Sequence, residues 1–377
     1  MKGKQGLVCM GLLLVLSSCH TGKQITASGL QRKDFQTEVN GQHTDLFTLS
    51  NKQGMEVCIT NYGARVVSIL VPDRNGKRED VVCGFSTITE YMEQRQNFGS
   101  TVGRYIGRIL NARFTLDGVE YKLVPNNGKS GHISHGGNPG FADRIWKVEQ
   151  ADTHRVRLSY LSPDGENGFP GNLKVTLVYS LGEDDNALDL TYEATTDAPT
   201  VLNLSHHSFF NISGNFTKSV EDQQLWVDAD RFPPYDDKKC VTGEYLPVAG
   251  TPLDFRMPHA IGECIDADHP QLKVVNGYDH TWELNTKGDD TRPAAWVYDP
   301  ASGRKMEIFT TEPGMQIYTG NGLKGKMTGK GGIAYPFRSA VCFETMHFQD
   351  SPNQPGFPST VLRPGEVFRS HTVYKFE

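Results

Sequence analysis

Two adjacent histidines, His206 and His207, lie in a stretch of β-forming residues that runs from 203 to 211. Successive side chains of a β-strand point to opposite faces of its sheet. One imidazole therefore faces each side of the sheet, and the two cannot contact the same ligand or ion. His207 shares its face with Asn203 and Ser205, a polar set that is costly to bury without hydrogen bonds. These residues alone leave two interpretations open, a hydrogen-bonded structural histidine and a functional one.

A second informative stretch, residues 341–348, contains Glu344 and His347. On a helix, two side chains three residues apart share one face and could bind one metal ion. On a strand the same two side chains point to opposite faces, which argues against metal binding. Glu344 instead shares its face with Cys342 and the apolar Met346. A carboxylate on an apolar face has a raised pKa unless it is hydrogen-bonded, and such a group suits general-base catalysis. The alternative is a salt-bridged core glutamate.

Three other polar side chains stand where a ligand could bind. Arg108 follows a run of spaced glycines that lacks both phosphate-loop patterns, and it is either a hydrogen-bond fork for a polar ligand or an ion-paired surface arginine. His135 lies in a glycine-rich loop over residues 132–141 and is either a ligand group or an exposed loop histidine. Asp254, among apolar neighbours, is either a turn residue or an acceptor for hydroxyl groups.

The elements that must position these residues have β character. Apolar and polar residues alternate over 174–181 and 188–193, and turn signals such as Asp73-Arg74-Asn75-Gly76 separate the runs. Residues 87–95 are the best helix candidate. With 39 Gly, 20 Pro and 10% aromatic residues in 377, the composition suits an all-β protein, a sandwich or stacked-sheet architecture. No linker or composition break follows residue 30, which favours one domain over residues 31–377.

Residues 1–18 have the features of a bacterial lipoprotein signal peptide. Lys2 and Lys4 precede an apolar run that is too short to span a bilayer, and Leu16-Ser17-Ser18-Cys19 resembles a lipoprotein cleavage box. We expect Cys19 to carry the lipid and residues 19–30 to form a flexible tether. We therefore expect the protein in the bacterial cell envelope, in the periplasm or on the outer surface. The alternative is an ordinary secretory leader that is cleaved nearby.

Charge and cysteine usage limit the possible partners. The formal net charge is -6, so a nucleic-acid partner is not indicated. Of the 7 cysteines, Cys9 leaves with the leader and Cys19 would be acylated; the remaining odd number, without tight spacing, does not indicate a disulfide framework. Neither C-x-x-C nor H-E-x-x-H occurs, so a zinc site is not expected. The G-x-S-x-G nucleophile elbow is also absent.

Taken together, a series of segments resembles the aldose 1-epimerase (galactose mutarotase) family from about residue 40 to the C-terminus. The most specific are Ser162-Pro163-Asp164-Gly165-Glu166-Asn167-Gly168-Phe169-Pro170-Gly171 and Ser205-His206-His207-Ser208-Phe209-Phe210-Asn211. In the same order follow residues 242–244, 250–255, 316–321, 343–345, 355–359 and 362–366. The resemblance implies a large antiparallel β-sandwich, the galactose mutarotase-like supersandwich, with an open sugar cleft.

By motif position, His207 is similar to the family's general acid and Glu344 to its general base. The resemblance also implies contacts to sugar hydroxyls from Arg108, His135, Asp254 and Gln316.

Three positions depart from the family's pattern. Gly107 and His206 stand where the family usually has Asn, and Phe209 stands where it commonly has Tyr. Gly107 and Phe209 thus belong to the expected sugar site. Because the acid and the base are retained, these departures bear on sugar preference.

The implied reaction interconverts the α and β anomers of free aldoses such as glucose and galactose by opening the ring. Glu344 would take the proton of the C1 hydroxyl and His207 would give one to the ring oxygen, from opposite sides of the sugar. No cofactor or metal is required. We expect a monomer whose partners are its monosaccharide substrate and, through Cys19, a membrane.

Three alternatives remain open at this point. A glycosidase would need two carboxylates across the scissile bond, for which Glu344 and Asp254 could serve, but His207 would then be unused. A non-catalytic sugar-binding module would keep Arg108 and Asp254 without needing the acid and the base. A sugar-phosphate epimerase is disfavoured because the mature chain carries -6 - 2 = -8 charges, after loss of two lysines, and has no evident basic cluster.

Overall fold

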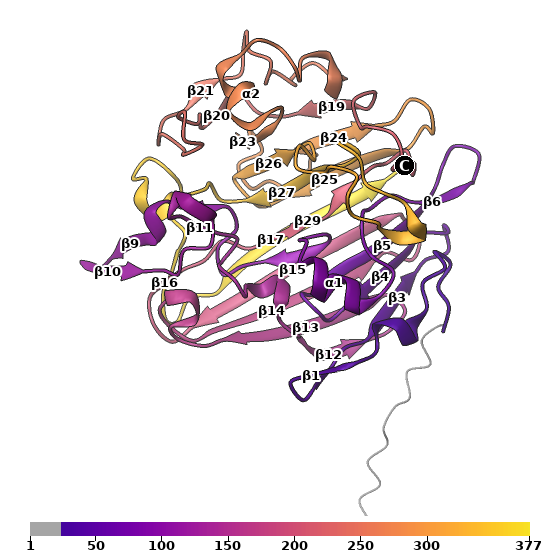
Figure 1. Ribbon diagram of the computed structural model, residues 1–377, viewed down its shortest axis with the longest axis horizontal. Helices are drawn as coiled ribbons and strands as arrows, with labels where there is room; N and C mark the ends of the chain where they lie inside the picture. The colour runs from indigo at the N-terminus through magenta and orange to yellow at the C-terminus, as the bar shows by residue number, and fades with distance from the viewer. Residues whose placement is uncertain (1–23) are drawn as a thin grey trace, which may run out of the picture.

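The computed structural model describes residues 24–377 and consists mainly of β-strands arranged in layers (Figure 1). Every pairing between two named strands in this range is antiparallel. The larger sheets of the described residues have nine, six and four strands, and five further sheets are two-stranded. The predicted all-β, antiparallel sandwich is confirmed.

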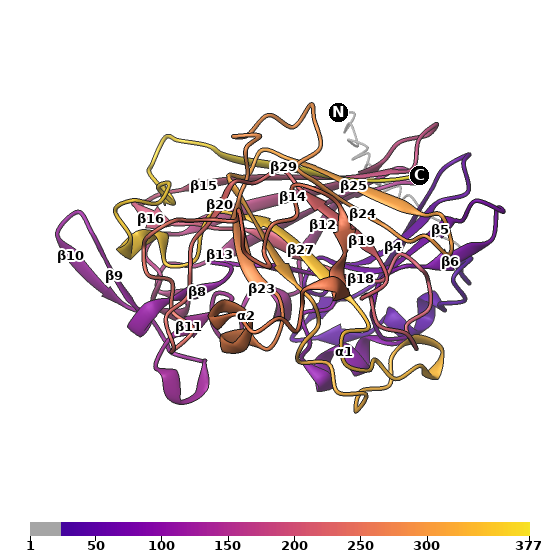
Figure 2. The ribbon, with the colours of Figure 1, turned by 90° about the horizontal axis from the view of Figure 1, so that it is seen from above.

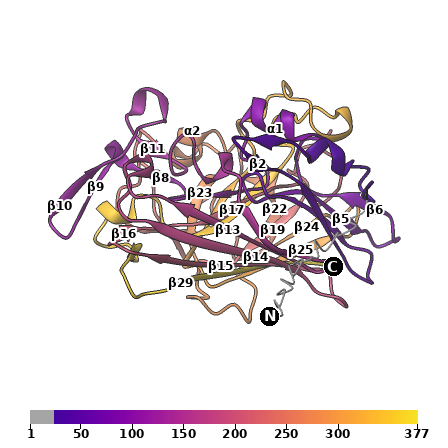
Figure 3. The same ribbon diagram turned by 90° about the horizontal axis from the view of Figure 1, so that it is seen from below.

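The largest sheet forms one complete layer. Its nine strands lie in the spatial order β12 (Lys147–Ala151), β13 (Arg155–Ser162), β14 (Leu173–Leu181), β15 (Ala187–Thr196), β29 (Phe368–Phe376), β25 (Lys305–Thr310), β24 (Ala295–Tyr298), β19 (Gln224–Val227) and β22 (His259–Ala260). The strand nearest the C-terminus, β29, therefore lies in the middle of the sheet, between β15 and β25. Figures 2 and 3 show this sheet along one side of the molecule, with both α-helices on the opposite side.

The remaining strands build the opposite layers. The six-stranded sheet contains β18 (Phe209–Phe210), β27 (Val341–Met346), β26 (Gly314–Tyr318), β23 (Asp279–Glu283), β20 (Arg231–Phe232) and β21 (Leu246–Pro247). The four-stranded sheet contains β3 (Leu46–Ser50), β4 (Glu56–Thr60), β5 (Arg65–Pro72) and β6 (Arg78–Asp80). The short pairs are β1 (Glu38–Val39) with β2 (Gln42–His43), β9 (Arg113–Leu116) with β10 (Val119–Lys122), β8 (Arg108–Ile109) with β11 (Ile133–Ser134), β16 (Thr200–Val201) with β28 (Val361–Leu362), and β7 (Ser100–Val102) with β17 (Ser205–His207).

Alternating burial explains why the sheets stack. Along β14 the residues Leu173, Val175, Leu177, Tyr179 and Leu181 are buried, and the residues between them are exposed or half-buried. Removing this apolar face from water stabilises the contact between the layers. One apolar cluster runs from Leu49 to Phe376 and includes residues of all three larger sheets.

Helical structure is limited to short segments. The predicted helix over residues 87–95 is confirmed as α1 (Ile88–Gln94), which Thr87 and Glu90 begin with a capping box. The second α-helix is α2 (Pro270–Val275). The 3-10 turns are η1 (Arg32–Phe35), η2 (Leu110–Ala112), η3 (Gly128–Ser130), η4 (Phe141–Asp143), η5 (Glu166–Gly168), η6 (Ile261–Glu263), η7 (Lys330–Gly332) and η8 (Ser351–Asn353). None of the helices within residues 24–377 has the length and hydropathy needed to cross a membrane.

The start of the described chain corrects one prediction. The signal peptide and Cys19 lie outside the described residues, but residues 24–30, expected to be part of a flexible tether, pack on the domain. Thr26 and Leu30 are each only 5% exposed, and the Ala27 N–H donates to Glu56 Oε1 over 2.6 Å. Small polar residues suggested a tether; Leu30, however, joins the apolar cluster that contains Phe35.

Candidate active site

A cavity of about 260 Å³ lies where the six-stranded sheet meets the loops before β7 and around β8 and β11. Seven of the eight site residues predicted within the domain line it: Gly107, Arg108, His135, His207, Phe209, Gln316 and Glu344. The other lining residues are Gln96, Asn97, Ser134, Asp279, Tyr318, Met346 and Gln349. This wall of hydrogen-bonding groups suits a ligand that carries many hydroxyls.

His207 and Glu344 face each other in this cavity. His207 ends β17 and Glu344 lies in the middle of β27, and the Nε2 and Oε1 atoms are 3.4 Å apart. Both side chains are almost fully buried, at 7% and 5% exposure. Met346 lines the same cavity as Glu344, so the predicted face of this strand is confirmed. The arrangement places an imidazole and a carboxyl within reach of one ligand.

His206 points away from the cavity, as the strand periodicity predicts. Its Nε2 lies 2.6 Å from Ser208 Oγ and its Nδ1 lies 3.4 Å from Tyr179 OH, on the side of the nine-stranded sheet. Burial lowers the pKa of His206 to about 3. His206 is therefore a neutral, hydrogen-bonded core residue.

Burial controls the protonation of the cavity pair. It lowers the pKa of His207 well below the ordinary 6.5, and neighbouring His135 lowers it further. Burial also raises the pKa of Glu344 well above 4.5, and the charge of Asp279 adds to this shift. Each group separately favours its neutral form, and at 3.4 Å their titrations are coupled. Both shifts favour the form in which Glu344 carries the proton and His207 is neutral.

His135 and Arg108 form one wall of the cavity. His135 has the left-handed backbone angle φ 52°, and the Gly107 N–H donates to its Nδ1 over 3.4 Å. Burial and then the charge of Arg108 lower the pKa of His135 to about 4. A neutral imidazole that accepts at Nδ1 carries its proton on Nε2. His135 thus offers a hydrogen-bond donor beside the guanidinium of Arg108.

The motif over residues 162–171 holds this wall in place. The Asn167 amide Nδ2 donates to the carbonyls of Gly136 and Pro139, over 2.8 and 2.9 Å. The Arg104 guanidinium holds the motif in place by donating hydrogen bonds to the carbonyl oxygens of residues 162, 163, 170 and 171. Unlike the segment 205–211, this motif does not line the cavity; it supports the loop that carries His135.

Asp254 is the one predicted contact within the domain that the structure does not bring to the cavity. Its carboxylate faces Arg256, with Oδ1 2.8 Å from Nε, in the turn that follows residue 250. The carboxylate that lines the cavity is Asp279 on β23. Gln316 Nε2 donates to Asp279 Oδ1 over 2.6 Å. The prediction for Asp254 is corrected because its nearest cation, two residues along the chain, turns it away.

Asp279 was missed because it begins a strand that otherwise reads as core. Tyr278 and Trp282 surround it in the sequence, and both are buried. The available signal was the placement of Asp279 and Thr281 on one face of the strand, opposite His280. Their register partners Tyr318 and Gln316 lie on β26, and Gln316 was predicted.

Phe209 and Cys342 complete the surroundings of His207. The Phe209 ring is stacked on the imidazole, with centroids 5.1 Å apart, and Cys342 Sγ lies 3.7 Å from Nδ1. His207, Cys342 and Glu344 have ligand atoms within 4.8 Å of one another, the one such trio among residues 24–377. However, Cys342 contacts Nδ1 and Glu344 contacts Nε2. Because two different ring nitrogens face the two partners, the arrangement suits proton transfer better than shared coordination of an ion.

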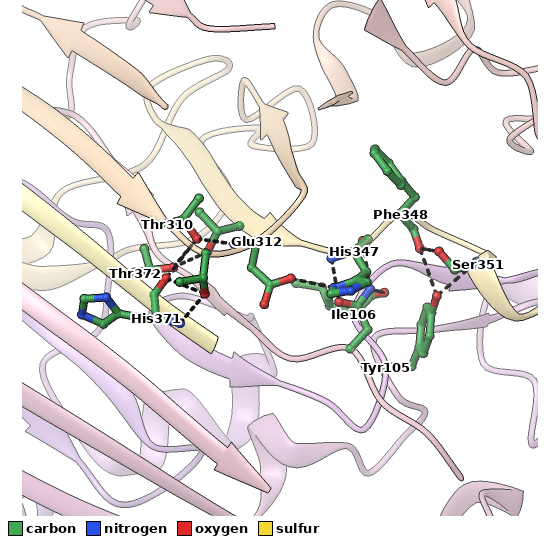
Figure 4. A network of polar contacts seen from close by, with 12 residues as sticks. Tyr105, Ile106, Thr310, Glu312, His347, Phe348, Ser351, His371 and Thr372 are labelled. Carbon is green, nitrogen blue, oxygen red and sulfur yellow. Dashed lines mark hydrogen bonds and ion pairs between the residues drawn. The ribbon is translucent and has the colours of Figure 1, made fainter. Parts of the chain in front are cut away.

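His347 lies on the other side of β27 from Glu344, as predicted. Its Nδ1 is 2.7 Å from Glu312 Oε2, and Asn203 holds its backbone. Figure 4 shows this contact within a polar network that continues through Thr310 and Thr372 towards His371. The network anchors the end of the strand that carries Glu344 to the nine-stranded sheet.

Comparisons with known proteins agree with this geometry. The aldose 1-epimerase family model matches residues 45–375. The chain is 39% identical over 330 residues to the galactose mutarotase of Sus scrofa, covering 88% of this chain and 93% of that protein. It is 36% identical over 339 residues to the aldose 1-epimerase of Escherichia coli K12, covering 89% and 96%. A solved aldose epimerase homologue from C. elegans superposes with a TM-score of 0.81 at 31% identity, covering 89% and 99%.

Proposed function

The chain belongs to the aldose 1-epimerase family, and we propose that His207 and Glu344 are the acid and the base of its reaction. The protein is an isomerase that interconverts the anomers of aldoses. Anomers interconvert by ring opening, which removes a proton from the C1 hydroxyl and delivers one to the ring oxygen. The reaction therefore needs one proton donor and one acceptor, both close to C1.

The observation that carries the proposal is the 3.4 Å separation of His207 Nε2 and Glu344 Oε1 in the polar cavity. The sequence led us to expect the acid and the base on opposite sides of the sugar. They are neighbours, and neighbours suit the chemistry because the C1 hydroxyl oxygen and the ring oxygen are bonded to the same carbon. One group can thus face each oxygen without a large movement of the ligand.

The pair needs only one proton between its two members. Transfer of that proton from Glu344 to His207 gives the form that opens the ring. Glu344 then takes the C1 hydroxyl proton while His207 protonates the ring oxygen, and the C1–O5 bond breaks to give the open-chain aldehyde. Rotation about C1–C2 and closure with reversed proton transfers give the other anomer. No charge accumulates on the pair over the cycle.

The remaining lining residues orient the sugar. Arg108 and His135 offer donors on one wall, and Asp279 with Gln316 offers acceptors and a donor on the other. Gly107 and Phe209 shape the space between them. Asp279 takes the role expected of Asp254. We propose glucose and galactose as substrates, as the galactose mutarotases among the relatives suggest.

Polarimetry of freshly dissolved α-glucose and α-galactose tests the assignment. The protein should accelerate the approach to the equilibrium rotation, and His207→Asn and Glu344→Gln should each abolish most of the acceleration. Full activity in either variant would remove that residue from the reaction. A wild-type protein that binds the sugars without accelerating mutarotation would favour a non-catalytic sugar-binding module.

We also propose where the enzyme works. The Leu16-Ser17-Ser18-Cys19 box supports lipidation of Cys19 and retention in the cell envelope, in the periplasm or on the outer surface. We propose that the folded domain is a monomer, which sedimentation of the protein without residues 1–23 would test. Among alternatives, a glycosidase loses support because Asp254, its expected second carboxylate, pairs with Arg256 outside the cavity.

A further inference from the structure

Gly107 and Gln349 compete for the same space in the cavity. A Cβ atom built on Gly107 would lie 2.6 Å from Gln349 Cγ and 3.3 Å from Gln349 Cδ. Carbon atoms cannot approach so closely, so a side chain at position 107 and the present position of Gln349 exclude each other. The departure of Gly107 from the family's Asn is therefore coupled to the placement of a glutamine that follows β27.

A chain of hydrogen bonds fixes how the Gln349 amide is turned. Asp279 Oδ1 accepts from Gln316 Nε2 over 2.6 Å, which directs the Gln316 oxygen away from Asp279. That oxygen accepts from Thr281 Oγ1 over 2.5 Å and from Gln349 Nε2 over 3.4 Å. Gln349 Nε2 also donates to Tyr235 OH over 2.8 Å. Both contacts use the amide nitrogen, so the Gln349 carbonyl oxygen takes part in neither hydrogen bond.

This oxygen has no hydrogen-bond partner among residues 24–377, although Gln349 is only 5% exposed. Gln349 lines the cavity together with Gly107 and Glu344. The oxygen is not one of the fully buried side-chain atoms without a partner among residues 24–377, so it is accessible from the cavity, where a ligand hydroxyl can donate to it.

We propose that Gln349 is a sugar-contacting residue that determines specificity, that it fills the space left by Gly107, and that its amide oxygen accepts a hydrogen bond from a hydroxyl other than that at C1. This inference rests on the proposed function, since Glu344 and His207 engage C1 and the ring oxygen. A site built to accept from a particular hydroxyl discriminates against sugars that lack it or carry it in the other orientation. The enzyme's preference among aldoses should thus depend on Gln349.

Gln349→Leu tests the proposal because leucine keeps most of the volume and loses the amide. For glucose and galactose, KM should rise roughly three- to tenfold for the sugar that uses the contact, with kcat changed less than about twofold. The same assay with monodeoxy sugars identifies the hydroxyl. For one deoxy position, wild type and Gln349→Leu should have equal KM values, because the hydroxyl of that contact is already absent.

Two results would overturn the proposal. One is an unchanged KM for every aldose in Gln349→Leu; the other is a KM difference that persists with every deoxy sugar, which would mean that Gln349 acts only through packing. The matched control is Gln223→Leu, which removes a buried amide bonded to Asn211 outside the cavity. This control should alter stability and leave KM unchanged. If Gln349→Leu does not fold, Gln349→Ala gives the same comparison, because alanine also lacks the amide and has no branched side chain to fit into the site.

The shared space gives a separate test. Asn tolerates the positive φ of 75° at position 107 better than other residues with side chains. Gly107→Asn alone should raise KM by displacing Gln349 from the sugar, and adding Gln349→Ala should then raise KM no further. A double variant worse than Gly107→Asn would contradict competition for one space. If wild type lacks mutarotase activity, the proposed function fails, and equilibrium sugar binding to the same variants still tests the contact.

Discussion

His207 and Glu344 meet at 3.4 Å although their strands belong to different sheets. β17 pairs with β7, whereas β27 pairs with β18 and β26. However, β18 begins two residues after His207 and pairs with β27 in the register Phe209↔Cys342, which, continued by two residues, sets His207 opposite Glu344. The pairing of β18 with β27 thus brings the acid and the base together, and the Phe209 ring packs against His207.

Removal of either member of the pair should disable catalysis without disabling binding. We expect Glu344→Gln and His207→Asn each to lower kcat roughly 10²-fold or more, since each removes one proton-transfer group. The double variant should be little worse than either single variant, because the two act as one unit. Polarimetric kcat and equilibrium sugar binding give the comparison.

His206→Asn is the control for this experiment. His206 lies beside His207 in the chain but is bonded to Ser208 and Tyr179 on the other face. Most activity should remain if the variant folds. Equal loss in His206→Asn and His207→Asn would refute the assignment of the two faces.

The pH profile of kcat/KM should be bell-shaped, because the active pair holds one proton. On the acid side a second proton is added, and burial lowers the pKa of His207, so this limb should fall below pH 6.5. On the alkaline side the last proton is lost, and burial with Asp279 raises the pKa of Glu344, so this limb should lie above pH 4.5. Both limbs belong to the coupled pair.

Asp279→Asn should move the alkaline limb towards lower pH, because it removes the negative charge that raises the pKa of Glu344. The position of the limb is the readout, since the variant also alters sugar binding. Asp254→Asn, whose carboxylate faces Arg256, should leave the profile in place. A shift of equal size in both variants would show that Asp279 is not a specific neighbour of the pair.

Phe209→Tyr should strengthen binding of at least one hexose. Phe209 lines the cavity, and a tyrosine hydroxyl there adds a hydrogen-bonding group. The expected decrease in KM corresponds to about 0.5–1.5 kcal/mol, the contribution of one hydrogen bond. KM values for glucose, galactose, xylose and arabinose check this. Unchanged values for all four would mean that the ring edge of residue 209 does not reach the sugar.

Asn167→Asp should weaken sugar binding although residue 167 does not line the cavity. Aspartate keeps the shape but cannot donate to the Gly136 and Pro139 carbonyls, so the loop with His135 loses two bonds. We expect KM to rise roughly tenfold and kcat to change less. Asn61→Asp, which loses two donations to the His43 and Trp146 carbonyls away from the cavity, is the control. A KM increase of the same size in both would point to general destabilisation.

Cys19→Ala should release the protein from the membrane fraction or leave it unprocessed, because Cys19 is the residue that we propose to be acylated. Fractionation after lysis, followed by mass spectrometry of the N-terminal peptide, measures the outcome. A wild-type protein found entirely in the soluble fraction would exclude the anchor.

Period-two patterns predicted the strands and the facing of His207 and Glu344 because side-chain alternation is a local property of the backbone. The family resemblance supplied Arg108, His135 and Gln316. Asp254 was assigned wrongly because its partner Arg256 is settled by turn geometry. Asp279 and Gln349 reach the cavity through register between β23 and β26 and through the space at Gly107. Contacts between distant segments of this kind leave no trace in local periodicity.

The central place of β29 has a consequence for biogenesis. The strand lies between β15 and β25, and the hydroxyl of its Tyr374 donates to the carbonyl of Phe343, the residue before the proposed base. Until residues 368–376 have left the ribosome, β15 and β25 each lack a neighbour, and their open edges are templates for misassembly. Pairing of Ala187 with Lys375 also closes a very long loop, which slows folding. We therefore expect the nine-stranded sheet to be completed only when synthesis of the chain is nearly finished.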